Sequence, residues 1–158
     1  VSEPKPDRLP MLDKLAQEYG ILVGLHGHSK QSSPNTWHPE LVAKLCQPFS
    51  PAIGAFSDTG HWLRSQLDPA AGVAILKDRV VGFEVHDLHA FDASGRDVPL
   101  GTGVGKLQDM FDTLARVKKG PVLLSVEYTS NPENPADDVK QCIQFLDRQA
   151  IRLAGSSP

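Results

Sequence analysis

The chain has 158 residues, of which 40% are hydrophobic and 22% are charged, and its formal net charge at pH 7 is −3. This composition is typical of one globular domain, because it supplies enough apolar residues to form a core. Proteins that coat nucleic acids or bind membrane surfaces are usually basic. We therefore expect neither a nucleic-acid partner nor a membrane partner.

Neither a membrane span nor a disulfide framework is indicated. No apolar run approaches the roughly 18 residues that a transmembrane helix needs. Cys46 and Cys142 lie in no metal-finger spacing, so we expect two reduced structural thiols. The chain begins with Val1 and shows no basic segment followed by an apolar one. We expect a cytoplasmic location, and a signal peptide before Val1 stays open.

Short apolar runs alternate with amphipathic stretches along the chain. An initial helix is predicted over 8–19, because its leucines recur at helical spacing and Gly20 follows. Four strand–helix units come next, with strands predicted at 21–25, 51–56, 80–85 and 122–126. The helices that follow these strands are predicted at 39–46, 68–76, 106–117 and from 134 or 135 onward. Residues 1–153 form one predicted domain, and 154–158 are expected to be a disordered tail.

This alternation predicts an α/β fold with a parallel sheet covered by helices. Two architectures satisfy it, a small doubly wound sheet and half of a (β/α)8 TIM barrel. In either fold, functional groups gather at the carboxyl ends of the strands. Each predicted strand here ends in or is followed by ionisable side chains, in chain order His26, His28, Asp58, His61, Glu84, His86 and Glu127.

Carboxylates and imidazoles from separate strands are the ligand set that Mn²⁺, Mg²⁺, Co²⁺ or Zn²⁺ takes. Asp58 has an alternative reading as the N-cap of a helix. Glu127 directly follows an apolar strand, where a buried and unpaired carboxylate would cost several kcal/mol. The long connection from 88 to 105 ends in a Gly-Thr-Gly-Val-Gly run before a helix. Such a run either binds an anion such as a sugar phosphate through its backbone N–H groups or is a flexible turn.

Five segments together resemble a known family: YGILVGLHGH, IGAFSDTGHWLRSQLDP, RVVGFEVHDLHAF, DVPLGTGVGKL and VLLSVEYTSNPENPADDVKQC. They are similar to the C-terminal half of sugar phosphate isomerase/epimerase proteins, in the xylose isomerase-like barrel superfamily that also includes family 2 apurinic endonucleases. The resemblance covers about residues 1 to 150. It implies an eight-stranded TIM barrel, of which this chain holds strands five to eight, and one divalent metal ion at the carboxyl-end mouth.

Site residues follow from the resemblance by position. The metal ligands that the resemblance implies are His26, Asp58, Glu84 and Glu127, with His86 as an alternative to Glu84 on the seventh strand. The chain departs from the family in two places, since His26 stands where a Glu is usual and Glu84-Val85-His86-Asp87 stands where His-x-Lys-Asp is usual. Either His86 substitutes as a ligand, because it shares a strand face with Glu84, or the metal is weak or absent.

The leading functional hypothesis is a metal-dependent isomerase or epimerase that moves a proton through an enediolate. Glu127 and His61 are the expected catalytic residues, and His61, Arg96 and His28 are expected to bind a sugar or sugar phosphate. The alternatives are a degenerate barrel that binds sugar without catalysis and a metal-dependent phosphodiesterase of the apurinic endonuclease type. Four strands leave two open sheet edges, so we also expect a homodimer or a part of a longer chain.

Overall fold

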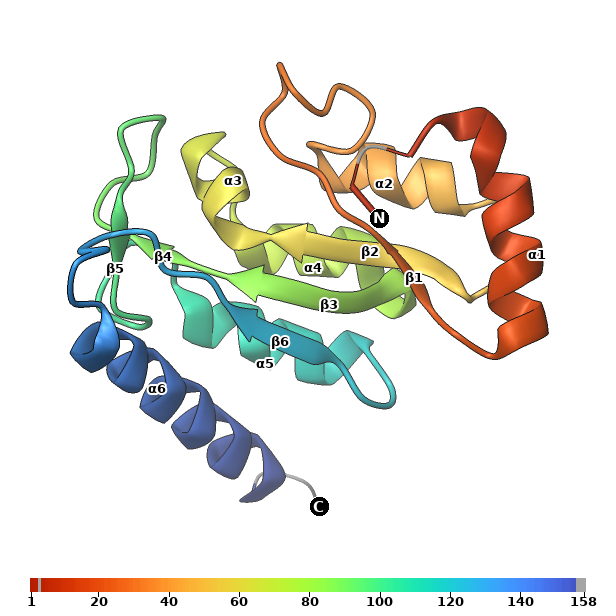
Figure 1. Cartoon of the computed structure of the whole chain (residues 1–158). Coiled ribbons are helices and arrows are strands. Elements are labelled where there is room, and N and C mark those ends of the chain that lie inside the picture. The colour runs from red at the N-terminus through yellow and green to blue at the C-terminus, as the bar shows by residue number, and fades with distance from the viewer. Residues whose placement is uncertain (3, 156–158) are drawn as a thin grey trace.

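A four-stranded parallel sheet forms the centre of the computed structural model, which describes residues 1–2 and 4–155 (Figure 1). The strands are β1 (Val23–Leu25), β2 (Ile53–Asp58), β3 (Val80–Val85) and β6 (Leu123–Val126). They lie in the order β1-β2-β3-β6, so neighbours in space are also neighbours along the chain. The predicted strands and their parallel arrangement are confirmed. The first strand begins at Val23 rather than Ile21, because Ile21 and Leu22 are exposed on the approach to it.

Helices precede, connect and follow the strands (Figure 1). They are η1 (Pro6–Arg8), α1 (Leu9–Tyr19), α2 (Pro39–Cys46), α3 (Thr59–Arg64), α4 (Pro69–Leu76), η2 (Lys77–Arg79), α5 (Leu107–Val117) and α6 (Ala136–Gly155). The short helix α3 has no counterpart among the predicted elements. Helix α6 continues through Gly155, and positions 156–158 of the predicted tail lie outside the described residues. No described helix has the length and apolar character needed to span a bilayer.

The core lies between the sheet and helices α2, α4 and α5, which contact one another in that order. Phe83 and Ile53 from the strands pack there with Leu76 and Met110 from the helices. Cys46 and Cys142 are buried and unpaired, as predicted. The opposite face of the sheet is open at β6, where Leu123 is 62% exposed. Only one face of this half-barrel-like sheet is therefore covered by the described residues.

The two edges of the sheet differ. At the β1 edge, Ser2 forms a parallel bridge with His26, and the N–H of His26 donates to the Val1 carbonyl over 3.0 Å. At the β6 edge, no further strand pairs within residues 1–2 and 4–155. The homodimer or longer chain expected from these edges stays a prediction.

The long connection after β3 is folded around one carboxylate. Asp87 is almost fully buried, and its side chain accepts the N–H groups of Gly101, Gly103 and Gly105, each at 2.9 Å. A Cβ on Gly103 would lie 2.5 Å from Oδ1 of Asp87, so a side chain there would collide with the carboxylate. These amides are thus satisfied within the chain. The prediction that this run binds an external sugar phosphate is therefore wrong.

The same connection contains a small antiparallel hairpin, formed by β4 (Asp87–Leu88) and β5 (Asp97–Val98). The pairing of Asp87 with Val98 brings Asp97 back to the carboxyl end of β3, eleven residues after His86. The glycine run, Asp87 and the hairpin together make this loop an ordered wall beside the strand ends.

Candidate metal centre

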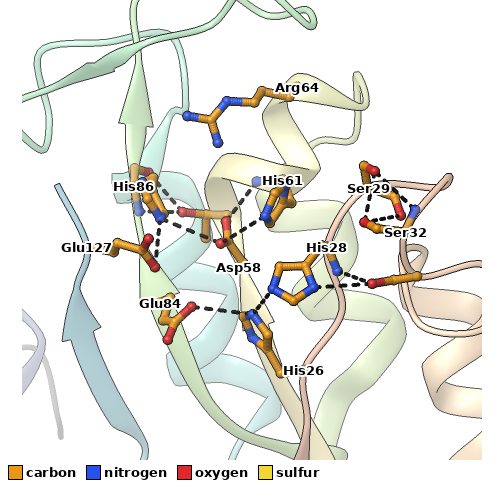
Figure 2. A network of polar contacts seen from close by, with 12 residues as sticks. His26, His28, Ser29, Ser32, Asp58, His61, Arg64, Glu84, His86 and Glu127 are labelled. Atoms are coloured by element: carbon orange, nitrogen blue, oxygen red, sulfur yellow. Dashed lines mark hydrogen bonds and ion pairs between the residues drawn. The ribbon is translucent and has the colours of Figure 1, made fainter. Parts of the chain in front are cut away.

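The strand-end side chains converge at the carboxyl end of the sheet (Figure 2). His26 follows β1, Asp58 ends β2, Glu84 belongs to β3 and Glu127 follows β6. Strand register explains the convergence, because Asp58 lies opposite Glu84 and Glu84 lies opposite Ser125, two residues before Glu127. Parallel strands that end at the same edge therefore deliver these groups to one place.

His26, Asp58 and Glu84 form a first group of possible metal ligands, with one ligand atom from each residue within 4.8 Å of the others. Nε2 of His26 lies 3.5 Å from Oε2 of Glu84. Nδ1 of His26 lies 3.2 Å from the carbonyl of Phe56, which can only accept, so Nδ1 carries the proton. In the neutral ring, Nε2 then offers its lone pair to the cluster.

Asp58, His86 and Glu127 form a second group, again within 4.8 Å. Nε2 of His86 lies 3.6 Å from Oδ2 of Asp58 and 3.6 Å from Oε2 of Glu127. The other ring nitrogen, Nδ1, hydrogen-bonds to Oδ1 of Asp97 at 2.8 Å. The His86 side chain is 3% exposed, and Nε2 has no hydrogen-bond partner among the described residues. A buried nitrogen without a partner, aimed between two carboxylates, fits a missing cation.

The electrostatics of the cluster also favour a cation. Burial raises the pKa of Glu84, and the neighbouring Glu127 and Asp58 add to that rise, while His26 opposes it. Burial would lower the pKa of His86, but Asp58 and Asp97 outweigh it and raise that pKa to about 10. Burial would raise the pKa of Asp58, but His86 and His61 hold it below its usual value. The raised pKa of His86 and the carboxylate contribution to the raised pKa of Glu84 reflect the negative charge gathered here, whereas the lowered pKa of Asp58 reflects its positive histidine neighbours.

The donor set and the spacing fit a divalent transition metal. Bonds of about 2.0 to 2.2 Å from one ion place neighbouring ligand atoms about 3 to 3.6 Å apart. The 3.5 Å and 3.6 Å separations in the two groups are of this size. Carboxylates supply the negative charge and imidazoles supply directional nitrogens. The residues present therefore fit a bound metal ion.

His61 and His28 lie next to Asp58 and His26 (Figure 2). Nε2 of His61 is 3.7 Å from Oδ2 of Asp58, and the rings of His61 and His28 meet edge to face with centroids 5.1 Å apart. Nε2 of His28 is also 3.2 Å from Nε2 of His26. Burial lowers the pKa of His61, although Asp58 opposes this, and the lowering favours the neutral ring. Both predicted substrate-binding histidines therefore lie beside the ligand groups.

Asp58 combines the two roles that its sequence position suggested. Its Oδ1 accepts the N–H of His61 at 2.7 Å and caps α3, which begins at the next residue. Its Oδ2 faces His86. The cap fixes the carboxylate, so the ligand oxygen is held in place by the helix that it starts.

Arg96 is not brought into the cluster. It is exposed on the long connection, and its N–H donates to Nδ1 of His89 at 3.0 Å. Arg64 lies over the site instead (Figure 2). Its Nε donates to the Gly95 carbonyl at 3.0 Å, and one terminal nitrogen is 3.6 Å from Oδ1 of Asp97.

Arg64 and Asp97 were both absent from the sequence-based site. Arg64 follows His61 by three residues and so shares a face of α3 with it, but that spacing is informative only once α3 is recognised. Asp97 accepts from His86, and also from the N–H and hydroxyl of Thr129 just after β6. Asp97, in the long connection, thus forms hydrogen bonds with residues that follow β3 and β6. No local sequence pattern predicts these contacts.

Comparison with known proteins agrees with this architecture. The model of the xylose isomerase-like TIM barrel family matches residues 7–149. Among curated proteins no match is significant. Solved structures with the same fold include a D-tagatose 3-epimerase-like protein, at 20% identity and a TM-score of 0.72, with 95% of this chain and 54% of that chain covered.

Two further structures are a 3-keto-D-glucoside 4-epimerase, YcjR, from E. coli (16% identity, TM-score 0.71, 90% and 52% covered) and an IOLI protein with a zinc atom (18% identity, TM-score 0.69, 97% and 59% covered). This chain therefore spans about half the length of these structures. The family model covers most of the chain, and the parallel βα units carry their polar groups at the strand ends. The chain belongs to the xylose isomerase-like TIM barrel family.

Proposed function

We propose that this chain contributes the metal-binding side of the active site of an isomerase or epimerase that acts on a sugar or sugar phosphate. The observation that carries the proposal is the convergence of Asp58, Glu84, Glu127 and two imidazoles at the carboxyl end of the sheet. The epimerases among the similar structures support the substrate class. Because the chain spans about half of those structures, the activity is that of the whole protein.

His26, Asp58 and Glu84 would hold a divalent ion, with Glu127 and His86 beside them. When bound, the ion supplies Lewis acidity that polarises a sugar carbonyl and makes the adjacent C–H more acidic. The imidazoles favour Zn²⁺, Co²⁺ or Mn²⁺ over Mg²⁺, which prefers oxygen ligands. The zinc atom in the similar IOLI protein supports a metal here.

Glu127 is the residue that we assign to proton transfer. Its side chain is 46% exposed, so a substrate in the mouth can reach it, whereas Asp58 is held by its cap and Asp97 by its hydrogen bonds. As a general base, the carboxylate takes the proton from the carbon next to the carbonyl, and as the conjugate acid it returns a proton to the enediolate. Return of the proton to the neighbouring carbon gives isomerisation, whereas epimerisation needs a second acid on the opposite face of the enediolate, because a single carboxylate reaches only one face.

His61, His28 and Arg64 would position the sugar. A neutral His61 can both donate a hydrogen bond to a sugar oxygen and accept one from a sugar hydroxyl. Arg64 is held by Gly95 and Asp97 at the rim, where its positive charge faces a negatively charged or hydroxyl-rich substrate. These groups bind and orient, and Glu127 moves the proton.

The experiment is solvent deuterium exchange, with ketoses, aldoses and their phosphates as substrates and the whole protein loaded with Mn²⁺ or Zn²⁺. Replacing Glu127→Gln should abolish exchange at the carbon next to the carbonyl while the circular dichroism spectrum is unchanged. Glu18→Gln is the matched control, because Glu18 is exposed on α1, which precedes the start of β1 and so lies at the other end of the sheet. Full exchange by Glu127→Gln would refute the assignment.

A phosphodiesterase is the second candidate, favoured by the presence of two ligand groups that share Asp58. A net charge of −3 opposes binding to a DNA backbone. Cleavage of an abasic duplex without any sugar exchange would support this candidate. Tight sugar binding with neither activity would instead support a sugar-binding module.

A further inference from the structure

A cavity of about 410 Å³ is lined by Leu63 of α3, Pro69 of α4 and Gly105 of the long connection, and it shares no residue with the two ligand groups. His61 points from α3 toward Asp58 (Figure 2). Leu63 follows His61 by two residues, and each residue turns an α-helix by about 100°. The cavity and the metal centre therefore lie on opposite sides of α3.

We propose that this cavity is a second ligand site, which binds a small molecule that carries an aromatic ring and an anionic group. Neither the metal ion nor the sugar chemistry of the proposed function enters this site. Its size, its apolar walls and the polar side chains around it each support the proposal.

The size and the fixed walls of the cavity are those of a small-molecule site. Such sites usually enclose about 300 to 1,000 Å³ and are largely formed before the ligand binds. Leu63 is 0% exposed and Pro69 is buried, so the core holds these walls. The N–H of Gly105 donates to Oδ1 of Asp87 at 2.9 Å, which holds the adjoining backbone. A Cβ on Gly105 would lie 3.2 Å from Cδ1 of Leu63, so even an alanine would crowd this wall.

Two large apolar side chains remain exposed at the cavity. Phe91 is 41% exposed and Val104 is 40% exposed, and both line it. A ligand that removes this apolar surface from water is stabilised by the hydrophobic effect. The aromatic wall favours a flat ring, because two aromatic rings in stacked or edge-to-face contact gain more than their burial alone provides. We therefore assign the ring of the ligand to Phe91.

The polar side chains at the cavity favour an anion. Asp68 is already engaged, because its Oδ1 accepts the N–H groups of Ala70 and Ala71 at 2.8 Å and 3.1 Å and caps α4. Lys106 also lines the cavity and is exposed, and it forms no ion pair within the part of the chain that the structure describes. Its ammonium can therefore donate to a carboxylate, a sulfonate or a phosphate, and such charge-assisted hydrogen bonds are strong.

The backbone around the cavity is held in an unusual conformation at two positions. Gln66 and Lys106 have φ values of 58° and 46°, in the left-handed region that residues other than glycine rarely adopt. Among the described non-glycine residues only Lys77 and Asn131 share this feature. Such conformations persist only where the surrounding structure fixes them, and they gather at binding sites. Fixed backbone positions at the rim reduce the ordering cost of binding.

The experiment compares two fluorescent probes that have the same rings. Anilinonaphthalene sulfonate carries an anionic group, and phenylnaphthylamine is its uncharged counterpart. The whole protein is titrated with each probe, and we expect saturable binding of one equivalent of the sulfonate. Phe91→Ala should weaken the binding of both probes about 10-fold or more. Lys106→Asn, which keeps a residue that tolerates a positive φ, should weaken the sulfonate about 10-fold and leave the uncharged probe unchanged.

Two further variants control for binding elsewhere on the protein. Val104→Trp fills the cavity and should abolish the binding of both probes while the circular dichroism spectrum is unchanged. Leu41→Ala removes an exposed apolar side chain from a separate groove beside α2, and this variant should match the wild type.

Three results would overturn the proposal. Sulfonate binding that persists in Phe91→Ala and Val104→Trp would place the probe elsewhere. Equal affinity for the two probes, unchanged in Lys106→Asn, would rule out an anionic ligand. Absence of binding in the folded whole protein, with a change of oligomeric state in Val104→Trp, would make the cavity a contact between copies of the chain. None of these results bears on the proposed sugar chemistry, which the deuterium exchange assay tests separately.

Discussion

Replacing Asp97→Asn tests the residue that joins the most elements at the site. The Asp97 carboxylate is 1% exposed and accepts from His86 and from both the N–H and the hydroxyl of Thr129. Burial would raise its pKa, but these hydrogen bonds and the charge of His86 outweigh burial and lower the pKa from 3.8 to about 2. The Asn side chain has one acceptor oxygen in place of the two oxygens of the carboxylate, so the N–H of either Thr129 or His86 loses its acceptor.

The size of the effect follows from the pKa. A lowering from 3.8 to about 2 corresponds to about 2.5 kcal/mol of folding free energy, at about 1.36 kcal/mol per pKa unit. A buried donor without a partner costs about 1 to 3 kcal/mol, which is similar. Because Asp97 holds His86 in place beside the candidate metal site, we also expect the variant to lose about 10- to 100-fold in affinity for the metal ion.

The assay is urea unfolding of the metal-free protein between pH 7 and pH 3. A carboxylate whose pKa is lower in the folded state stabilises the fold above its unfolded pKa, and this contribution disappears as pH falls toward the folded pKa. The wild type should therefore exceed Asp97→Asn by about 2.5 kcal/mol above pH 5, and the difference should shrink steadily below about pH 4. Glu133→Gln, a change at an exposed carboxylate after β6, should match the wild type. A difference that is absent at pH 7, or constant down to pH 3, would refute the reasoning.

Three further predictions concern the same end of the sheet. The pKa of His86 is raised to about 10, so the metal-free protein should lose stability as pH rises from 6.5 toward 10. Bound metal should remove this loss. A stability by urea unfolding that does not change with pH in the metal-free protein would contradict the prediction. Asp87→Asn removes a carboxylate that accepts hydrogen bonds from four backbone N–H groups. It should lower the free energy of unfolding by about 2 to 4 kcal/mol and speed tryptic cleavage in the 88–105 connection. An unchanged cleavage rate would show that Asp87 does not hold this connection in place. Arg64→Lys keeps the positive charge but removes the planar guanidinium, which can donate two parallel hydrogen bonds. The variant should raise KM for a sugar phosphate more than it lowers kcat. Changes of equal size in KM and kcat would place Arg64 outside substrate binding.

Much of the fold follows from local patterns. Apolar runs bounded by glycine, proline and charged residues locate all four parallel strands within a few residues. Asp68 followed by Pro69 marks the start of α4, and the side chain of Asp68 accepts from the N–H groups of Ala70 and Ala71. These features depend on neighbours in the sequence, so the sequence is enough to find them. The candidate ligand residues were predicted for a related reason, because parallel strands bring their carboxyl ends to one edge.

What the sequence could not supply depends on contacts between distant segments. Helix α3 has only six residues and begins with Thr59 and Gly60, so its apolar pattern is too short to recognise. Without that helix, Arg64 cannot be placed beside His61, and Arg96 was chosen from the long connection instead. The hairpin that returns Asp97 to His86 has only two residues in each strand. The glycine run folds around the carboxylate of Asp87, which lies fourteen or more residues earlier in the chain.

The central claim is that acidic and imidazole groups from successive strands surround a cation. The most direct measurement is an anomalous difference map from crystals of the whole protein grown with Mn²⁺ or Zn²⁺. The account predicts a strong peak within bonding distance of Asp58 and of at least one of His26 and His86. A map without a peak beside Asp58, at full occupancy of metal in solution, would contradict it.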